Sequence, residues 1–142
     1  MPFERFMALA LYDPDGGFFG SGPLRSAKSG DFLTSPEVSR WFGRTLARAV
    51  GNPRSVVEVG AGSGSLLQPL VAALPERPER VIAIDASPAS RTALSDLGFE
   101  TARDLADLEE PFEGVIVANE LIDNLPMRMA ERAGDAWVER WI

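Results

Sequence analysis

The stretch SVVEVGAGSG, from Ser55 to Gly64, decides how this chain folds. Its valines form the short β-branched run that a fully buried parallel strand needs, and the run ends in glycines at alternate positions, Gly60, Gly62 and Gly64. Leucine and valine then recur at helical spacing from Leu66 to Leu74. The stretch therefore predicts a strand, a glycine loop and a helix, which together make the first half of a nucleotide-binding βαβ unit.

The glycine loop predicts a ligand site. Glycine has no side chain and takes positive φ readily, so the backbone of such a loop can approach a ligand closely. The helix that follows turns its free N–H groups and positive dipole end toward that ligand. We therefore expect a cofactor here, while a tight structural turn would use the same glycines.

The residues around the glycines indicate which cofactor. The dinucleotide fingerprint is G-x-G-x-x-G, whereas this loop reads E-x-G-x-G-x-G, with Glu58 two positions before the first glycine. The pattern resembles motif I of the class I S-adenosylmethionine (SAM) methyltransferases. The resemblance implies that Glu58 and the three glycines surround the cationic methionine part of SAM, where a pyrophosphate would be repelled.

A second carboxylate follows the next predicted strand. The apolar run from Val81 to Ile84 ends at Asp85, 21 residues after Gly64. In nucleotide-binding βαβ units, the carboxylate that binds the ribose hydroxyls is expected about 20 residues after the glycine loop. Ser87 and Pro88 then supply an N-cap and a first-turn proline for a helix. Asp85 is thus a candidate ribose ligand, and the alternative is a solvated residue at a strand end.

Composition limits the chemistry. The chain has 142 residues, of which 45% are hydrophobic, as in one globular domain with a proper core. It contains no cysteine and no histidine, so disulfides, thiolate or histidine metal ligands and histidine general bases are excluded. Acid or base chemistry must come from carboxylates, Tyr12, lysine or water. Without a transmembrane-length apolar run or a signal-peptide layout, we expect a cytoplasmic location.

The charge is unevenly distributed along the chain. The net charge is −7, yet Met1 to Ser55 carries seven basic residues against five acidic ones, while the remainder carries seven against sixteen. An acidic cofactor half is a poor non-specific binder of nucleic acid, because affinity for phosphates comes largely from lysine and arginine. The acidic half of the chain would instead suit a cationic substrate.

The N-terminal part predicts two helices. Pro2 to Leu11 has apolar residues at helical spacing and is followed by strong turn chemistry. Ser35 as N-cap and Pro36 as first helical residue begin a second helix, which Gly51 closes. Its expected apolar face consists of Val38, Trp41, Phe42, Thr45, Leu46 and Ala49. On its other face, Arg40, Arg44 and Arg48 form either a solvated stripe or a partner surface.

Four segments resemble one family. FMALALYDPDGGFF (Phe6 to Phe19) and GDFLTSPEVS (Gly30 to Ser39) look like the N-terminal signature of the MidA-like SAM-dependent methyltransferases, and the similarity continues through VVEVGAGSG and NELIDNLP (Asn119 to Pro126). This family includes a mitochondrial complex I assembly factor that dimethylates an arginine in a complex I subunit. The resemblance implies SAM as cofactor, a protein arginine as methyl acceptor, and a respiratory-chain subunit as a possible partner. It also implies that Thr34, Ser35 and Pro36 cover the cofactor.

The predicted architecture is a Rossmann-like α/β domain over residues 54–142, preceded by a helical segment, residues 1–53, that covers the cofactor site. We expect a mainly parallel sheet in the order 3-2-1-4-5 with helices on both faces. Its third strand should lie near Phe99 to Ala102, a buried fourth strand at Val115 to Ala118, and a hairpin about Gly134 and Asp135. MidA-like proteins are much longer, so the domain is expected to be C-terminally incomplete.

The remaining candidates follow the third and fourth strands. By resemblance Asp104 and Leu105 meet the adenine ring, although a surface turn fits them equally. Asn119, Glu120 and Asp123 stand where open α/β sheets place reacting groups, so they are the candidate catalytic residues. If the acceptor is an arginine, as the resemblance implies, Glu120 would hold its guanidinium. Alternatively, Asn119 caps the next segment and Asp123 is solvated. Since the family's C-terminal part is missing, a non-catalytic SAM-binding or assembly module is the competing function.

Overall fold

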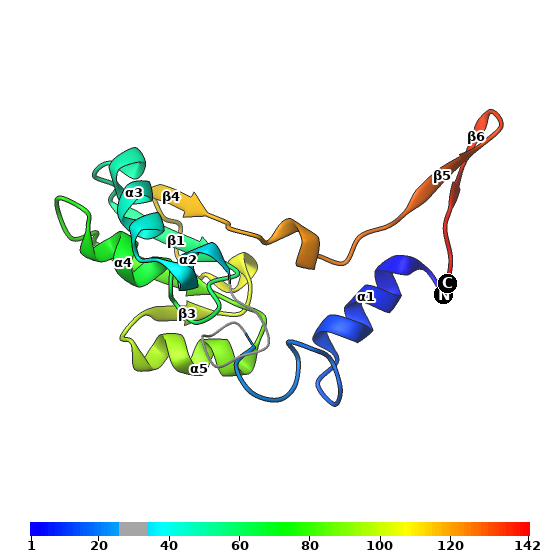
Figure 1. The fold of residues 1–142 in the computed structure, drawn as a ribbon, viewed down its shortest axis with the longest axis horizontal. Coiled ribbons are helices and arrows are strands. Elements are labelled where there is room, and N and C mark those ends of the chain that lie inside the picture. The colour runs from blue at the N-terminus through cyan, green and yellow to red at the C-terminus, as the bar shows by residue number, and fades with distance from the viewer. Residues whose placement is uncertain (26–33) are drawn as a thin grey trace.

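The structure is a computed structural model that describes residues 1–25 and 34–142. The start of the second signature segment, Gly30 to Leu33, and the lysine considered for acid or base chemistry, Lys28, lie outside the described residues. The described chain forms a body around a parallel sheet and a slender arm that leaves this body (Figure 1).

The valine run before the glycine loop forms β1, Ser55–Val59, at the centre of the sheet. On one side it pairs in parallel with β2, Arg80–Ile84, which pairs with β3, Glu100–Ala102. On the other side it pairs in parallel with β4, Gly114–Val117. The order β3-β2-β1-β4 agrees with the first four positions of the predicted order. Val56 and Val57 are fully buried, as a central strand requires.

Three helices cover one face of this sheet. They are α3, Trp41–Val50, α4, Leu67–Ala72, and α5, Pro88–Asp96. Their buried side chains pack with those of the central strands in one core: Ala47, Val56, Ala61, Leu67, Leu70, Ala83 and Leu94. The other face is covered by the segment after β3, where Leu108 and Phe112 flank a short 3₁₀ turn, Leu105–Asp107. The expectation of helices on both faces is therefore wrong for the described residues, because the connection from β3 to β4 forms only this 3₁₀ turn.

The predicted fifth strand does not join the sheet. β5, Ala130–Ala133, pairs antiparallel with β6, Ala136–Glu139, in a separate hairpin. The turn lies at Gly134 and Asp135 as predicted, with Gly134 at φ +63°. Because the two strands satisfy each other's backbone groups, β4 remains an edge strand of the body. The expectation that β4 is buried is therefore wrong, and its Ile116 is 52% exposed.

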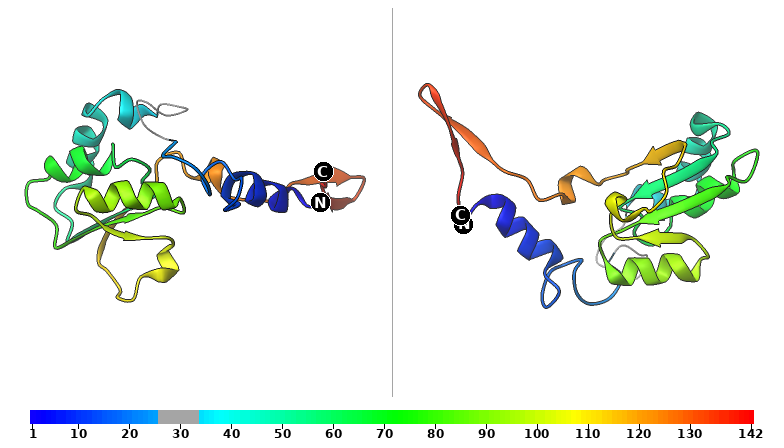
Figure 2. Two further views of the ribbon diagram at one scale, coloured as in Figure 1. Left: turned by 90° about the horizontal axis from the view of Figure 1, so that it is seen from below. Right: turned by 180° about the vertical axis from the view of Figure 1, so that it is seen from behind.

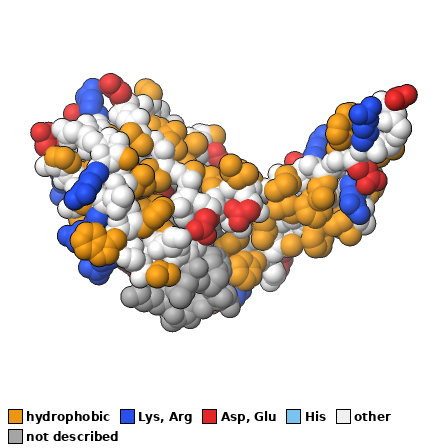
Figure 3. Space-filling view, turned by 45° about the horizontal axis from the view of Figure 1, so that its top comes forward, with side chains coloured by type: hydrophobic (Ala, Val, Ile, Leu, Met, Phe, Trp, Pro, Cys, Tyr) orange, Lys and Arg blue, Asp and Glu red, His pale blue; other side chains and the backbone are white. Residues whose placement is uncertain are grey.

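The hairpin and α1, Phe3–Tyr12, together build the arm. Pro2 forms a bridge with Trp141, the amide of Ile142 donates to the Met1 carbonyl, and Arg128 pairs with Glu4 at 3.0 Å. The two termini consequently lie side by side at the far end of the arm, as both views of Figure 2 show. No side chain of α1 is fully buried, and apolar side chains gather along the arm surface (Figure 3).

The second predicted helix is divided into two. α2, Ser35–Val38, is separated from α3 by Ser39 and Arg40, and its N-cap is Thr34 rather than Ser35. The expected apolar face is not the buried one, since Val38 is 72% and Trp41 is 68% exposed. Gly43 and Ala47 are buried instead, because α3 approaches α4 so closely that only small residues fit. Gly51 closes the helix as predicted, at φ +77°.

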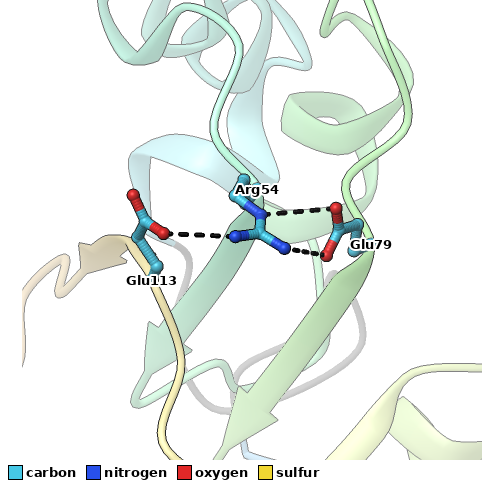
Figure 4. Close-up of polar contacts among 3 residues, drawn as sticks. All are labelled: Arg54, Glu79 and Glu113. Carbon is cyan, nitrogen blue, oxygen red and sulfur yellow. Dashed lines mark hydrogen bonds and ion pairs between the residues drawn. The ribbon is translucent and has the colours of Figure 1, made fainter.

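Ion pairs join three strands at the amino edge of the sheet. Arg54, just before β1, donates to Glu79 at 3.0 Å and to Glu113 at 3.3 Å (Figure 4). Glu79 precedes β2 and Glu113 precedes β4. The three side chains are 62%, 66% and 82% exposed, so water screens their attraction. Their place at the amino edge leaves the carboxyl edge open for a ligand.

The contact of α3 with α4 yields a stability prediction. A Cβ added to Gly43 would lie 2.9 Å from the Leu66 carbonyl oxygen and 3.0 Å from the Leu70 amide nitrogen. We expect Gly43→Ala to lower the free energy of unfolding by about 1–3 kcal/mol, although alanine favours an isolated helix by about 1 kcal/mol. Chemical denaturation measures this change. Gly16→Ala is the control, since nothing lies within 4 Å of its Cβ position. An unchanged free energy for Gly43→Ala would contradict the close packing.

Candidate active site

A cavity of about 640 Å³ lies at the carboxyl edge of the sheet. Its walls come from the segments that follow β1, β2, β3 and β4, and from the N-terminal part of the chain. Most of the predicted site residues line it, namely Glu58, Gly60, Gly62, Asp85, Asp104, Leu105, Asn119, Glu120, Asp123, Thr34 and Pro36. Carboxylates outnumber the lining arginines, Arg25 and Arg103, so the cavity suits a cationic ligand.

The glycine loop is tied to the end of β2. The amides of Gly60 and Ala61 donate to the Ile84 carbonyl at 2.8 and 3.1 Å. Gly60 and Gly62 have φ +75° and +55°, a conformation that side chains disfavour. Gly64 also has positive φ but lies outside the cavity lining. A Cβ there would lie 3.0 Å from Leu97 at the end of α5, so Gly64 has a packing role, and its contact with the cofactor stays a prediction.

Asp85 organises the loop from the neighbouring strand. Its Oδ2 accepts from the Gly62 amide and its Oδ1 accepts from the Ser87 amide, both at 2.8 Å. Arg91 of α5 donates to the Asp85 carbonyl at 2.7 Å and fixes the backbone as well. Each carboxylate oxygen retains an acceptor position for a ligand hydroxyl. Asp85 therefore lines the cavity and also joins the glycine loop to the start of α5.

Glu58 is a buried acid with an unpaired oxygen. The residue is 3% exposed, and its Oε2 has no partner among the described residues. Burial, and then the charge of Asp85, raise the pKa of Glu58 to about 8, while a hydrogen bond from the Leu67 amide opposes the shift. An orphaned carboxylate oxygen in a cavity wall is a costly feature that a cationic ligand group would relieve.

The cover predicted from the second signature is present in part. Thr34 and Pro36 line the cavity, whereas Ser35 does not. Glu37, in the first turn of α2, is 6% exposed and connects this cover to the glycine loop. It accepts from the Thr34 amide at 2.8 Å and from the Ser63 hydroxyl at 3.3 Å, and so attaches α2 to the glycine loop. The T-x-x-E capping-box spacing could have identified it.

The loop after β4 carries the candidate catalytic residues. Glu120 has φ +52°, the only non-glycine residue with positive φ in the described ranges. The Asn119 amide group donates to its carboxylate at 3.4 Å, and the Asn124 amide group donates to its carbonyl at 3.0 Å. The following 3₁₀ turn, Ile122–Asn124, has Leu121 as N-cap, so Asn119 does not cap it. Asp123 lies in that turn and lines the cavity.

Asp104 and Leu105 lie in a surface turn at the cavity, and their contact with the adenine ring stays a prediction. They line the cavity, and Asp104 also caps a 3₁₀ turn by accepting from the Ala106 amide at 2.9 Å. Tyr12, which the sequence indicates only for acid or base chemistry, also lines the cavity. Its hydroxyl donates to the Asn124 carbonyl at 2.7 Å. Burial, and then the charges of Asp85 and Asp123, raise the pKa of Tyr12, so the hydroxyl keeps its proton.

Two other kinds of site were sought in residues 1–25 and 34–142. No group of three acidic side chains there is placed to hold a metal ion. None of the helices in this part combines the length and the apolar character that crossing a membrane requires.

The chain was compared with known proteins. Residues 38–142 match the model of a family described as S-adenosyl-L-methionine-dependent methyltransferase. A curated relative from Drosophila melanogaster, named protein arginine methyltransferase NDUFAF7 homolog, mitochondrial, is 30% identical over 52% of this chain and 19% of its own length.

Two crystal structures of COG1565 superfamily proteins from Burkholderia thailandensis are also similar. One, with bound S-adenosyl-homocysteine, has a TM-score of 0.80 at 31% identity and covers 99% of this chain and 41% of that protein. The other, a native structure, has a TM-score of 0.68 at 31% identity and covers 99% and 39%. This chain thus spans about two fifths of those proteins. On the strength of the family match and the fold, the chain belongs to the MidA-like S-adenosyl-L-methionine-dependent methyltransferase family.

Proposed function

We propose that this chain binds SAM in the cavity at the carboxyl edge of the sheet and transfers its methyl group to a protein arginine. The observation that carries the proposal is the buried, unpaired carboxylate oxygen of Glu58 beside the glycine loop. Such a group fits a cationic ligand and disfavours a pyrophosphate. The family and the S-adenosyl-homocysteine of the crystallised relative support the same cofactor.

Each end of the cofactor has residues that would hold it. Glu58, Gly60 and Gly62 would surround the methionine part, Asp85 would accept from the ribose hydroxyls, and Asp104 with Leu105 would face the adenine. SAM supplies an electrophilic methyl group on a positively charged sulfur when it is bound. The N-terminal segment, residues 1–53, would cover the site, since Tyr12, Phe19, Arg25, Thr34 and Pro36 line the same cavity.

The acceptor group would be held by the loop after β4. A guanidinium is permanently protonated, so it must be positioned with one nitrogen in line with the methyl group. The carboxylate of Glu120 can make a paired, charge-assisted hydrogen bond that fixes its position and angle. Asp123 would add a second carboxylate, and Asn119, whose amide group donates to Glu120 at 3.4 Å, would orient it.

The name of the Drosophila relative supports a protein arginine as acceptor. By family resemblance, a respiratory-chain subunit is one such protein. The acidic cavity and the absence of histidine agree with a reaction in which a carboxylate or water takes the proton late.

Cofactor binding yields the first functional prediction. Titration calorimetry should show binding of SAM and none of NAD. Asp85→Asn removes the charge that the ribose hydroxyls would meet, and its single acceptor oxygen can keep only one of the two backbone hydrogen bonds, so SAM affinity should fall by about 10-fold or more. Asp96→Asn, at the exposed end of α5, is the matched control and should bind as the wild type does. Tight NAD binding without SAM binding would refute the proposed cofactor.

Glu58 yields a proton-linkage prediction. Its pKa is about 8 in the ligand-free site, so at pH 7 the carboxyl group is mostly protonated. A cationic ligand favours the ionised form and lowers that pKa, and the group must therefore release a proton on binding. Calorimetry in buffers of different ionisation enthalpy should detect this release at pH 7. Glu58→Gln should abolish it, and the same release in that variant would exclude Glu58 from the methionine site.

Glu120 yields the prediction for the reaction. Glu120→Gln should leave SAM affinity unchanged and slow methyl transfer by about 10²-fold, the scale of one lost transition-state contact. Transfer of labelled methyl groups to a co-purified protein or an arginine peptide measures the rate. Glu131→Gln, in the exposed hairpin, is the control. Equal turnover in Glu120→Gln would remove Glu120 from the mechanism, and SAM binding with no transfer by the wild type would favour a non-catalytic binding module.

A further inference from the structure

Two signature segments far apart in the chain meet at one hydrogen bond. Tyr12 is the last residue of α1, and Asn124 lies in the 3₁₀ turn after β4, 112 positions away. The Tyr12 hydroxyl donates to the Asn124 carbonyl at 2.7 Å, in a partly buried position on the cavity wall. The arm is thereby joined to the loop that carries the candidate catalytic residues.

The same turn restrains Glu120. The side-chain amide of Asn124 donates to the Glu120 carbonyl at 3.0 Å. Glu120 has φ +52°, a conformation that residues with a side chain rarely adopt and that persists only where the surroundings enforce it. A Cβ added to Gly60 would lie 3.0 Å from Cδ1 of Leu121, so Leu121 packs the loop after β4 against the glycine loop. Asn124 is thus the residue through which a contact can reach the backbone of Glu120.

Tyr12 is itself held rigidly. The amide of Phe18 donates to the Ala10 carbonyl at 2.8 Å, and the chain folds back so tightly that a Cβ on Gly17 would lie 2.8 Å from the Tyr12 amide nitrogen. The ring of Tyr12 stacks on that of Phe19, with centroids 6.0 Å apart. A fixed ring delivers its hydroxyl at a fixed place, and the raised pKa keeps that hydroxyl a donor.

We propose that the Tyr12 hydroxyl is a positioning group for methyl transfer, acting through Asn124 on Glu120. The bond holds the 3₁₀ turn, the turn holds the carbonyl of Glu120, and the carboxylate of Glu120 is kept over the cavity. This inference rests on the proposed function, in which Glu120 positions the acceptor. It gives the N-terminal arm a part in the reaction geometry beyond covering the cofactor.

Kinetics separate positioning from a merely structural role. Tyr12→Phe keeps the ring and its stacking but removes the donor, so kcat should fall by about 10-fold while SAM affinity stays unchanged. In the Glu120→Gln background the same substitution should add less than about a twofold change, because groups that act as a unit are not additive. Asn124→Ala should reproduce both results. Thr92→Val removes a hydroxyl that donates to the Pro88 carbonyl at an exposed position of α5, and serves as the control.

Hydrogen exchange provides a readout that needs no activity. In Tyr12→Phe, deuterium uptake should rise in the peptide that spans residues 119–125 and stay unchanged in the peptide of β1 and the glycine loop. Unchanged uptake at residues 119–125, or an unchanged kcat, would overturn the proposal. So would equal rate losses in the wild-type and Glu120→Gln backgrounds. If the wild type transfers no methyl group, the proposed function fails, and the uptake at residues 119–125 alone decides whether Tyr12 positions the loop.

Discussion

The carboxylate of Asp85 is the point on which the site depends. Its two oxygens accept from the Gly62 and Ser87 amides at 2.8 Å, so one side chain joins the glycine loop after β1 to the start of α5 after β2. The loop is held in its positive-φ conformation by this bridge and by the Ile84 carbonyl. Without the bridge, amides that line the cavity would turn outward, and the carboxyl edge would lose its shape.

One buried carboxyl group in the cavity wall lowers the stability of the protein when no ligand is bound. Glu58 is buried, and this burial, followed by the negative charge of Asp85, raises the pKa of Glu58 to about 8. A protein retains such a group where a ligand compensates its cost. The amino edge, where Arg54 joins two exposed glutamates, has no comparable burial.

Local patterns predicted the features that depend on neighbouring residues. The valine run, the glycine loop and Asp85 give the sheet order of four strands and the cavity, because strand ends meet at one edge. The spacing of apolar residues alone could not show that Gly64 faces α5. Nor could it show that the small residue Gly43 is buried while Trp41 is exposed. Those outcomes depend on how closely two elements approach. The contact of Tyr12 with Asn124 spans almost the whole chain and leaves no local signal.

The most direct test of the account is an amide NMR titration of the labelled chain with S-adenosyl-homocysteine. The account predicts shifts at Gly60, Gly62 and Asp85, at Asp104 and Leu105, and at the loop from residue 119 to 125, with the amides of β5 and β6 unchanged. Shifts confined to the hairpin would contradict the claim that the carboxyl edge of the sheet is the cofactor site. The absence of any shift at millimolar S-adenosyl-homocysteine would contradict it as well.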